Sequence, residues 1–256
     1  MWWTMRAVTK TPDSLTTALH DHICHAIADA GGWLGFDRFM ALALYTPGLG
    51  YYANDSTKFG AMPGSGSDFV TAPELTRLFG QTLAVQVGEA LEHTATCEVW
   101  EFGAGSGALA LQLLDALGDK VQRYIIVDLS GSLRLRQQTQ LAAHAHKVHW
   151  VDALPDRIEG VVVGNEVLDA MPVQLLARHG GQHNGHWHER GVVVQDDGHF
   201  AWADRPTALR PPLDIEGPHD YLTEIHRQGE AFIRTLADRL ERGAAILLDY
   251  GFGEDE

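Results

Sequence analysis

The chain has 256 residues, of which 45% are hydrophobic and 21% are charged, and its 34 acidic residues outnumber 19 Lys and Arg to give a net charge of −15. This composition is typical of a globular protein, and no run approaches the roughly 18 apolar residues that a membrane-spanning helix needs. The negative charge argues against general binding to nucleic acid or anionic lipid, which depends on neutralising phosphates. The length allows one large domain or one domain with an appendage.

Cysteine usage and the first residues bear on the cellular compartment. Cys24 and Cys97 are the only cysteines and show no CxxC spacing, so neither a disulfide framework nor a structural zinc site is expected. The start, MWWTMRAVTK, lacks the apolar segment of a signal peptide and is too poor in Arg and Ser for a transit peptide. We therefore expect a reducing compartment, with a cytoplasmic location as the default.

The first third of the chain predicts two helices separated by a long loop. Apolar residues recur at four-residue spacing over Leu15–Ile27, which predicts an amphipathic helix ending near Gly31. The stretch Tyr45–Pro73 is rich in Gly, Pro, Ser and Asn, which is typical of a loop. A loop longer than about 15 residues is commonly a functional lid or disordered, and the interleaved aromatic residues favour the lid. The second helix is predicted over Leu75–Leu91.

From Glu98 onward, predicted strands alternate with predicted helices. The strands are short and rich in β-branched residues, and we place them at Glu98–Phe102, Tyr124–Leu129, Val148–Val151, Gly160–Gly164 and Ala244–Tyr250. Helices are expected at Ala108–Leu117, Ser132–His144 and Tyr221–Glu241. Gly-rich turns over Val173–Trp202 predict inserted antiparallel hairpins. The pattern indicates an α/β fold with a mostly parallel sheet that helices cover on both faces.

The stretch VWEFGAGSGALA places a glycine-rich turn between the first of these strands and the helix that follows. Gly103, Gly105 and Gly107 allow close approach of a ligand, and the amides at the helix start can face an anionic group. Gly103, Gly105 and Ala108 also satisfy the dinucleotide pattern GxGxx[G/A], and a turn used only for tight packing is a further alternative. The turn alone therefore predicts a ligand without identifying it.

Acidic residues beside the strands favour S-adenosylmethionine over a dinucleotide. Glu101, two residues before the first glycine, could serve the ammonium group of that cofactor. Asp128, at the end of the second strand, is placed for the ribose diol, although it could instead cap the next helix. In HWVDAL, Asp152 could accept from the adenine amino group, while Trp150 could lie near the ring or belong to the core.

A set of motifs, in the same order, resembles the MidA-like family of S-adenosylmethionine-dependent methyltransferases from about Leu34 to the last residue. They are LYTPGLGYYAND, SDFVTAPEL, VWEFGAGSGALA, YIIVDLSGSLRLRQ, GNEVLDAMPVQ and LLDYGFGE. The resemblance implies a class I, Rossmann-like methyltransferase fold with an N-terminal helical and loop extension and a β-hairpin insertion after the fourth strand. It also implies that Thr71, Pro73 and Glu74 cover the cofactor, although Glu74 could equally be an acid in the first turn of a helix.

The resemblance also predicts boundaries and a substrate. We expect an extension at residues 1–92 and a methyltransferase domain at 93–256 with inserted hairpins at 172–218. Family members continue beyond the DYG motif, whereas this sequence stops at Glu256, so we expect a truncated product that lacks the final strands. The family pattern GDF reads GSDF here. Mitochondrial members assist assembly of respiratory complex I by symmetrically dimethylating an arginine, so the resemblance implies a protein arginine, such as one of a respiratory-complex subunit, as acceptor.

The segment GNEVLDAMP supplies candidate catalytic residues for such an acceptor. Glu166 and Asp169 follow the fourth strand, at the sheet edge where open α/β folds bind ligands, and could grip a guanidinium and accept its proton. Either acid could instead cap a turn or pair with an Arg. Asn165 could position the acceptor or satisfy backbone groups, and Asp249 and Tyr250 face the same edge.

Two functions of other classes remain as alternatives, and no metal is expected. The chain could be a noncatalytic assembly or binding module that keeps the fold, or an NAD-dependent oxidoreductase, which the absence of an evident hydride-transfer partner disfavours. Four of the fourteen histidines cluster in RHGGQHNGHWHE, at His179, His183, His186 and His188, without the spacing of a metal site.

Overall fold

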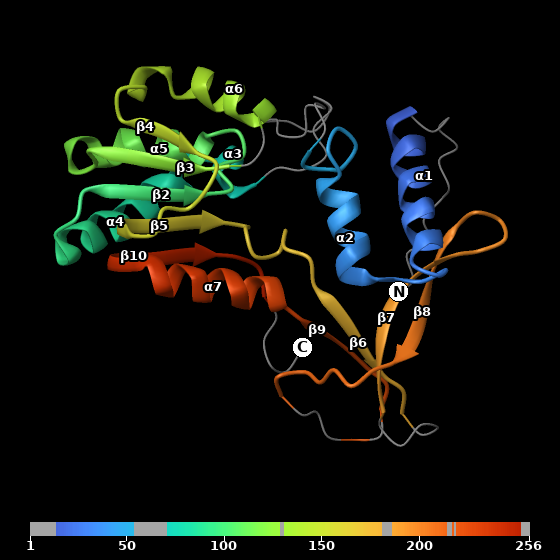
Figure 1. Ribbon diagram of the computed structural model, residues 1–256. Coiled ribbons are helices and arrows are strands. Elements are labelled where there is room, and N and C mark those ends of the chain that lie inside the picture. Colours follow the sequence, from blue (N-terminus) through green and yellow to red (C-terminus); the bar gives the residue numbers. More distant parts are fainter. Residues whose placement is uncertain are drawn as a thin grey trace. The chain divides into compact units, whose positions relative to one another are not determined.

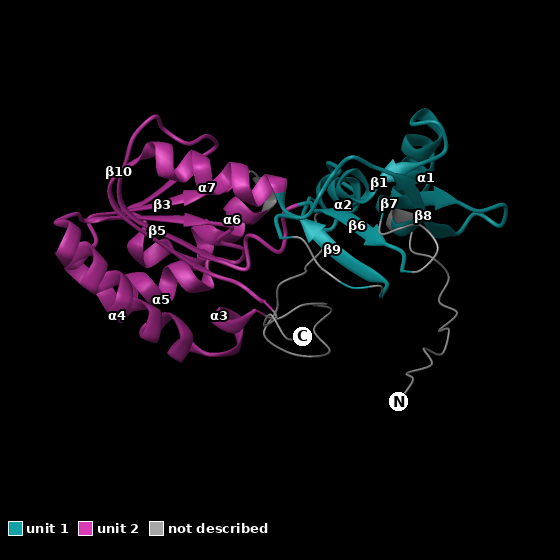
Figure 2. Cartoon of the chain, turned by 90° about the horizontal axis from the view of Figure 1, so that it is seen from below, with its two compact units in different colours: residues 1–54, 172–226 teal, residues 55–171, 227–256 magenta. Residues whose placement is uncertain are grey.

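The computed structural model describes residues 14–53, 71–128, 131–180, 186–213, 217 and 219–251. The chain divides into two compact units (Figure 2): unit 1 comprises residues 1–54 and 172–226, and unit 2 comprises residues 55–171 and 227–256. This division differs from the predicted boundary at residue 92. Helix α4 (Arg77–Thr94) packs into the core of unit 2, whereas the inserted strands pair and pack with the first helices in unit 1.

Unit 2 confirms the predicted α/β fold with a parallel sheet. Within the described residues its five strands follow the order β10-β5-β2-β3-β4 (Figure 1), and every neighbouring pair is parallel. The strands are β2 (Glu98–Phe102), β3 (Arg123–Val127), β4 (Val148–Val151), β5 (Ile158–Asn165) and β10 (Leu240–Leu248). The other helices of the unit are α3 (Ala72–Leu75), α5 (Ala108–Leu117), α6 (Gly131–Gln140) and α7 (Arg227–Arg239), with 3-10 turns η1 (Gly118–Lys120) and η2 (Ala142–His144).

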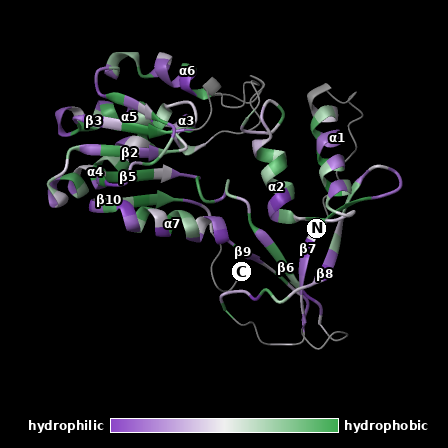
Figure 3. Ribbon diagram, in the orientation of Figure 1, coloured by the Kyte–Doolittle hydropathy of each residue, from purple (hydrophilic) through white to green (hydrophobic). Residues whose placement is uncertain are grey.

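Side chains of the central strands alternate between two buried faces. On one face Val99 and Ile126 pack with residues of α4 and α5, and on the other Trp100 and Ile125 pack with Leu236 of α7. Figure 3 shows hydrophobic residues along these strands. Because helices cover both faces, the strands are continuous apolar runs, which is why their positions were readable from the sequence.

Unit 1 combines two helices, α1 (Ser14–Asp29) and α2 (Phe36–Tyr45), with an antiparallel sheet. The strand order is β1-β7-β6-β9, and β8 pairs with β7. The strands are β1 (Leu34–Gly35), β6 (Gln174–Arg178), β7 (Trp187–Val194), β8 (Phe200–Pro206) and β9 (Tyr221–Ile225). Ile23 and Ile27 of α1 pack with Leu34 and Val192 in a separate core. The predicted hairpins over Val173–Trp202 are therefore confirmed as part of this sheet.

Two other predicted elements differ from the structure. The helix predicted over Tyr221–Glu241 was wrong in its first part, because these residues alternate in burial and pair antiparallel with β6 as strand β9. The last strand ends at Leu248, so Asp249 and Tyr250 follow it. Most of the predicted lid, residues 54–70, lies outside the described residues. Among the described residues, no helix is long and apolar enough to cross a bilayer.

Candidate functional site

The glycine-rich turn joins β2 to α5 at the carboxyl end of the central strand of unit 2. Gly103, Gly105 and Gly107 have φ angles of +65°, +52° and +88°, a backbone region that glycine adopts far more readily than other residues. A Cβ atom at Gly103 would lie 3.2 Å from Cγ2 of Val167, in the loop that follows β5. The glycines therefore serve both the backbone conformation and the close packing of two loops at this edge.

The TAPE segment lies against the start of α5. The Ser106 hydroxyl, in the glycine turn, donates a short hydrogen bond to Glu74 of α3 and accepts one from the Ala108 backbone N–H at 3.3 Å. Pro73 is buried, and Thr71 is the N-cap residue of α3. The predicted proximity of this segment to the glycine turn is thus observed, while its contact with a cofactor stays a prediction.

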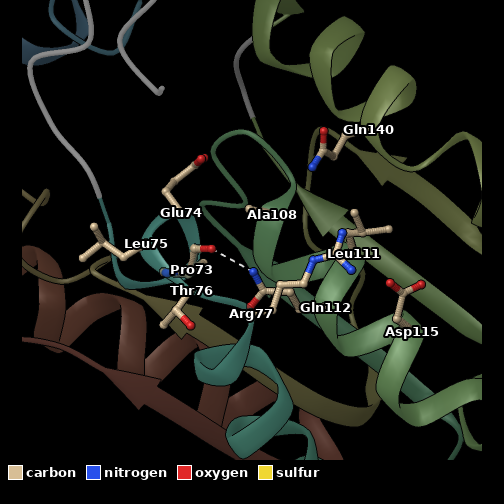
Figure 4. A pocket seen from close by; sticks show the side chains of 10 residues that line it. All are labelled: Pro73, Glu74, Leu75, Thr76, Arg77, Ala108, Leu111, Gln112, Asp115 and Gln140. Atoms are coloured by element: carbon tan, nitrogen blue, oxygen red, sulfur yellow. Dashed lines mark hydrogen bonds between the residues drawn. The ribbon is translucent and has the colours of Figure 1, made fainter. Parts of the chain in front are cut away.

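Gln112 holds the same segment from inside α5, a role that the sequence did not reveal. Its Nε2 donates to the Pro73 carbonyl at 2.7 Å (Figure 4), and its Oε1 accepts from the Gly80 backbone N–H at 2.9 Å. Both partners precede Gln112 by more than 30 residues. The only signal in the sequence was that Gln112 is one of two polar residues, with Asp115, in the mostly apolar helix ALALQLLDAL.

A surface depression of about 240 Å³ adjoins this contact. Figure 4 shows its lining, which consists of Pro73, Glu74, Leu75, Thr76, Arg77, Ala108, Leu111, Gln112, Asp115 and Gln140. These residues come from α3, α4, α5 and α6. The depression does not include Asp128 or Glu166, so it is distinct from the sheet edge where ligands of open α/β folds bind.

Glu101 lies in the core, although the sequence suggests a contact with a cationic ligand. It is 2% exposed, and the Tyr124 hydroxyl donates to its Oε2 at 2.7 Å. The pKa of Glu101 is raised to about 7, mainly by burial; the hydrogen bond from Tyr124 opposes the shift, and the nearby Asp128 charge adds to it. A cation bound close to Glu101 would favour its charged form.

The replacement Glu101→Gln should remove a pH dependence of stability. The pKa of Glu101 is about 7 in the folded state and 4.5 ordinarily. The stability that the folded protein gains from protonated Glu101 is therefore fully present below about pH 4.5 and is lost as the pH rises through 7. A shift of this size corresponds to at most roughly 3 kcal/mol. Urea unfolding at about pH 5 and about pH 8 should show a larger loss of stability in the wild type than in the variant. An equal loss in both proteins would contradict this assignment.

Asp128, which follows β3, takes part in a buried network around Gln137 of α6. The Gln137 Nε2 donates to Asp128 Oδ2 at 2.8 Å and to the Gly105 carbonyl at 3.0 Å, and its Oε1 accepts from Trp150 Nε1 at 2.8 Å. The structure thus brings together Gly105, Asp128 and Trp150, while their predicted contacts with a cofactor stay predictions. Gln137 lies within the motif YIIVDLSGSLRLRQ, but its position in the sequence did not predict that its side chain connects these three residues.

Asp152 differs from the other predicted cofactor residues in its surroundings. Its side chain is 77% exposed and forms an ion pair with Arg134 of α6. An exposed ion pair of this kind contributes little to stability. The contact of Asp152 with adenine stays a prediction, and Arg134 is a competing partner for the Asp152 carboxylate.

The loop after β5 places Glu166 in an unusual backbone conformation. Its φ is +54°, and its N–H donates to the Leu248 carbonyl of β10 at 2.8 Å. The Asn165 Nδ2 donates to Glu166 Oε1 at 3.3 Å, while Oε2 is buried and has no hydrogen-bond partner in the described part of the chain. Left-handed backbone at a residue other than glycine is costly and clusters at functional sites, and a buried carboxylate oxygen without a partner can receive a ligand N–H.

Asp249 and Asp169 complete an acidic group at this edge. Asp249 Oδ2 accepts from the backbone N–H groups of Leu168 at 2.8 Å and Asp169 at 3.2 Å, so it holds the loop. Burial raises the pKa of Asp169, and the charges of Asp249 and Glu166 add to the shift. The Tyr250 N–H donates to Asp249 Oδ1 at 3.0 Å, and the Tyr250 side chain is exposed. The loop therefore concentrates negative charge beside the glycine turn.

The histidine-rich segment lies in unit 1. His179 Nε2 is 2.9 Å from Asp204 Oδ2, and His183 lies outside the described residues. Within the ranges that the structure describes, no group of three or more His, Cys, Asp or Glu residues could hold a metal ion.

Comparison with known proteins adds a family to this geometry. Residues 82–256 match the family described as "Putative S-adenosyl-L-methionine-dependent methyltransferase". The mitochondrial protein arginine methyltransferase NDUFAF7 of Danio rerio is 26% identical over 97% of this chain and 65% of its own length. Its homologue in Caenorhabditis elegans is 25% identical over 96% of this chain and 65% of its own length.

A solved structure from Burkholderia thailandensis, bound to S-adenosyl-homocysteine, is 49% identical to this chain and superposes with a TM-score of 0.86. The superposition covers 96% of this chain and 66% of the other. The chain thus spans about two thirds of the length of the proteins that it matches. The agreement in structure confirms the predicted methyltransferase fold.

Proposed function

Because the chain belongs to the family of putative S-adenosyl-L-methionine-dependent methyltransferases, we propose that it binds S-adenosyl-L-methionine in unit 2 and transfers the methyl group to an acceptor at the loop after β5. One observation carries this proposal: Gly103 of the glycine turn packs against Val167, between the candidate acids Glu166 and Asp169. The donor turn and the acceptor loop are therefore neighbours at the carboxyl edge of one parallel sheet, where α/β folds bind ligands.

The residues present fit S-adenosyl-L-methionine. The glycine turn at the start of α5 suits the carboxylate of its methionine part, because backbone amides at a helix start favour an anion. Asp128 suits its ribose diol, and Asp152, which pairs with Arg134, suits its adenine amino group. Glu101 is 2% exposed and accepts from the Tyr124 hydroxyl, so it would favour the ammonium group through its charge rather than through an exposed carboxylate. Thr71, Pro73 and Glu74 form one wall through the bond between Glu74 and Ser106. When bound, the sulfonium supplies an electrophilic methyl group.

We place the acceptor, an arginine side chain of a protein, at Glu166 and Asp169. A guanidinium is a planar cation with five N–H donors, and carboxylates can grip it bidentately. The Oε2 of Glu166 is buried and could receive such a donor, in competition with the Tyr250 side chain, which hydrogen-bonds to the same carboxylate. The names of the Danio rerio and Caenorhabditis elegans relatives support this choice of acceptor.

The acids have two tasks in this reaction. By binding one edge of the guanidinium they localise its positive charge there and leave the attacking nitrogen richer in electrons. When that nitrogen forms its bond to the methyl carbon, it carries one proton too many, and a carboxylate of the pair can accept it. Asn165 orients Glu166 through the bond between Nδ2 and Oε1.

A labelling experiment tests the proposed function. The chain is incubated with methyl-labelled S-adenosyl-L-methionine and a host lysate, and mass spectrometry locates the label. Label on arginine is expected. Label on lysine or on a small molecule would contradict arginine as the acceptor but would still support methyltransferase activity. Cofactor binding without any transfer would favour the noncatalytic binding module, and binding of NAD in place of S-adenosyl-L-methionine would favour the oxidoreductase.

A further inference from the structure

Gln137 is a fully buried amide that connects three segments of unit 2. Its side chain has an exposed fraction of 0%. Its partners belong to the turn after β2, the end of β3 and strand β4. A buried amide that loses a hydrogen-bond partner destabilises the folded state, so Gln137 is tied to all three of its partners.

The partners of Gln137 fix which way its amide points. The indole N–H of Trp150 can only donate, so it must meet the amide oxygen. The amide nitrogen then faces two acceptors, the Gly105 carbonyl and the Asp128 carboxylate. Exchange of the oxygen and the nitrogen would disrupt all three bonds, which makes the amide a rigid spacer between the glycine turn and Asp128.

We propose that Gln137 is a positioning residue, which holds the Asp128 carboxylate in the orientation that binds the ribose diol and so makes the site selective for ribonucleosides. The inference rests on the proposed function, because it requires an adenosyl ligand at Asp128. A carboxylate that is already oriented loses less conformational freedom when it binds a diol, so the Gln137 bond increases affinity only for ligands that carry both hydroxyls.

Selectivity between two ligands tests this role. Titration calorimetry measures the Kd of S-adenosylhomocysteine and of its 2′-deoxy analogue for the wild type, Gln137→Leu and Gln138→Leu. Gln138 is the neighbouring residue on α6 and is exposed, so it is the matched control. Gln137→Leu should weaken the ribonucleoside by about tenfold and the deoxy analogue by less than about threefold, while Gln138→Leu should change neither.

A second variant tests the same role if Gln137→Leu does not fold. Trp150→Phe removes only the donor that orients the amide and keeps an aromatic ring at a half-buried position. It should lower selectivity for the ribonucleoside by about threefold. Urea unfolding establishes that each variant tested is folded.

The possible outcomes separate this inference from the proposed function. If the wild type binds neither nucleoside, both are overturned. If the wild type binds the ribonucleoside but the Gln137→Leu and Trp150→Phe variants keep its selectivity, the inference alone is overturned. Equal weakening of both ligands in Gln137→Leu indicates a purely structural role and also overturns it, as does a wild type that binds both ligands equally well.

Discussion

Replacing Gly105 with Val is expected to weaken S-adenosylhomocysteine binding by at least about 100-fold. Gly105 has a φ of +52°, where a β-branched side chain is strained, and its carbonyl accepts from Gln137 at 3.0 Å. The backbone would relax toward negative φ and move that carbonyl away from Gln137. Because the same amide holds Asp128, both the turn and the acid lose their positions. Titration calorimetry of the purified chain measures the effect.

The control for this variant is Gly118→Val. Gly118 has a nearly identical φ of +53° and lies at the end of α5, and a Cβ atom added there would meet no other atom within 4 Å. Both variants should lose stability on the order of 1–3 kcal/mol through backbone strain. Only Gly105→Val should lose ligand binding. Binding that survives in Gly105→Val, or is lost equally in Gly118→Val, would show that the glycine turn is not the cofactor site.

Replacing Glu166 with Gln is expected to lower the rate of methyl transfer by about 10²–10⁴-fold, the usual contribution of a positioned acid or base. The amide cannot accept a proton, and it presents a donor where the guanidinium needs an acceptor. S-adenosylhomocysteine should bind within about threefold of the wild type, because the proposed function assigns Glu166 to the acceptor, and the donor turn packs against Val167 through Gly103. The labelling assay gives the rate, and calorimetry gives the affinity.

The control for Glu166 is Glu159→Gln. Glu159 lies near the start of β5, the strand that Glu166 follows, and it pairs with Arg242 on the surface. Its replacement should leave transfer and binding unchanged, since exposed ion pairs contribute little. Methyl transfer at the wild-type rate in Glu166→Gln would exclude Glu166 as a catalytic residue. A parallel loss of cofactor binding would instead place it in the donor site.

The raised pKa of Asp169 has a consequence for the acceptor side. Since burial and the charges of Asp249 and Glu166 favour its protonated form, acidification should neutralise Asp169 at a higher pH than an ordinary aspartate. Asp169 binds the guanidinium of the acceptor in its charged form. The pH at which acceptor binding weakens should therefore be higher than for an aspartate with an ordinary pKa.

Several features of the site were readable from local patterns. The β-branched runs located the parallel strands because both faces of such a sheet are buried. The glycines of GAGSG and the acids at the strand ends indicated a ligand, since parallel strands bring their carboxyl ends to one edge whatever the rest of the chain does. The hairpins before Trp202 were equally clear, because Gly-rich turns interrupt short apolar runs. Strand β9 was missed, since the apolar residues of Tyr221–Glu241 suit either a strand or a helix and pairing with β6 decides between them.

The sequence by itself determined the parallel sheet, the glycine turn and the acids beside it, because these follow from side-chain periodicity and from backbone angles that only some residues accept. Tertiary structure alone decided which polar groups meet. It buried Glu101 against Tyr124, joined Gln137 to Asp128 and Trp150, and combined residues 1–54 with residues 172–226 in one unit. Such pairings depend on contacts between residues far apart in the chain, which no local pattern encodes.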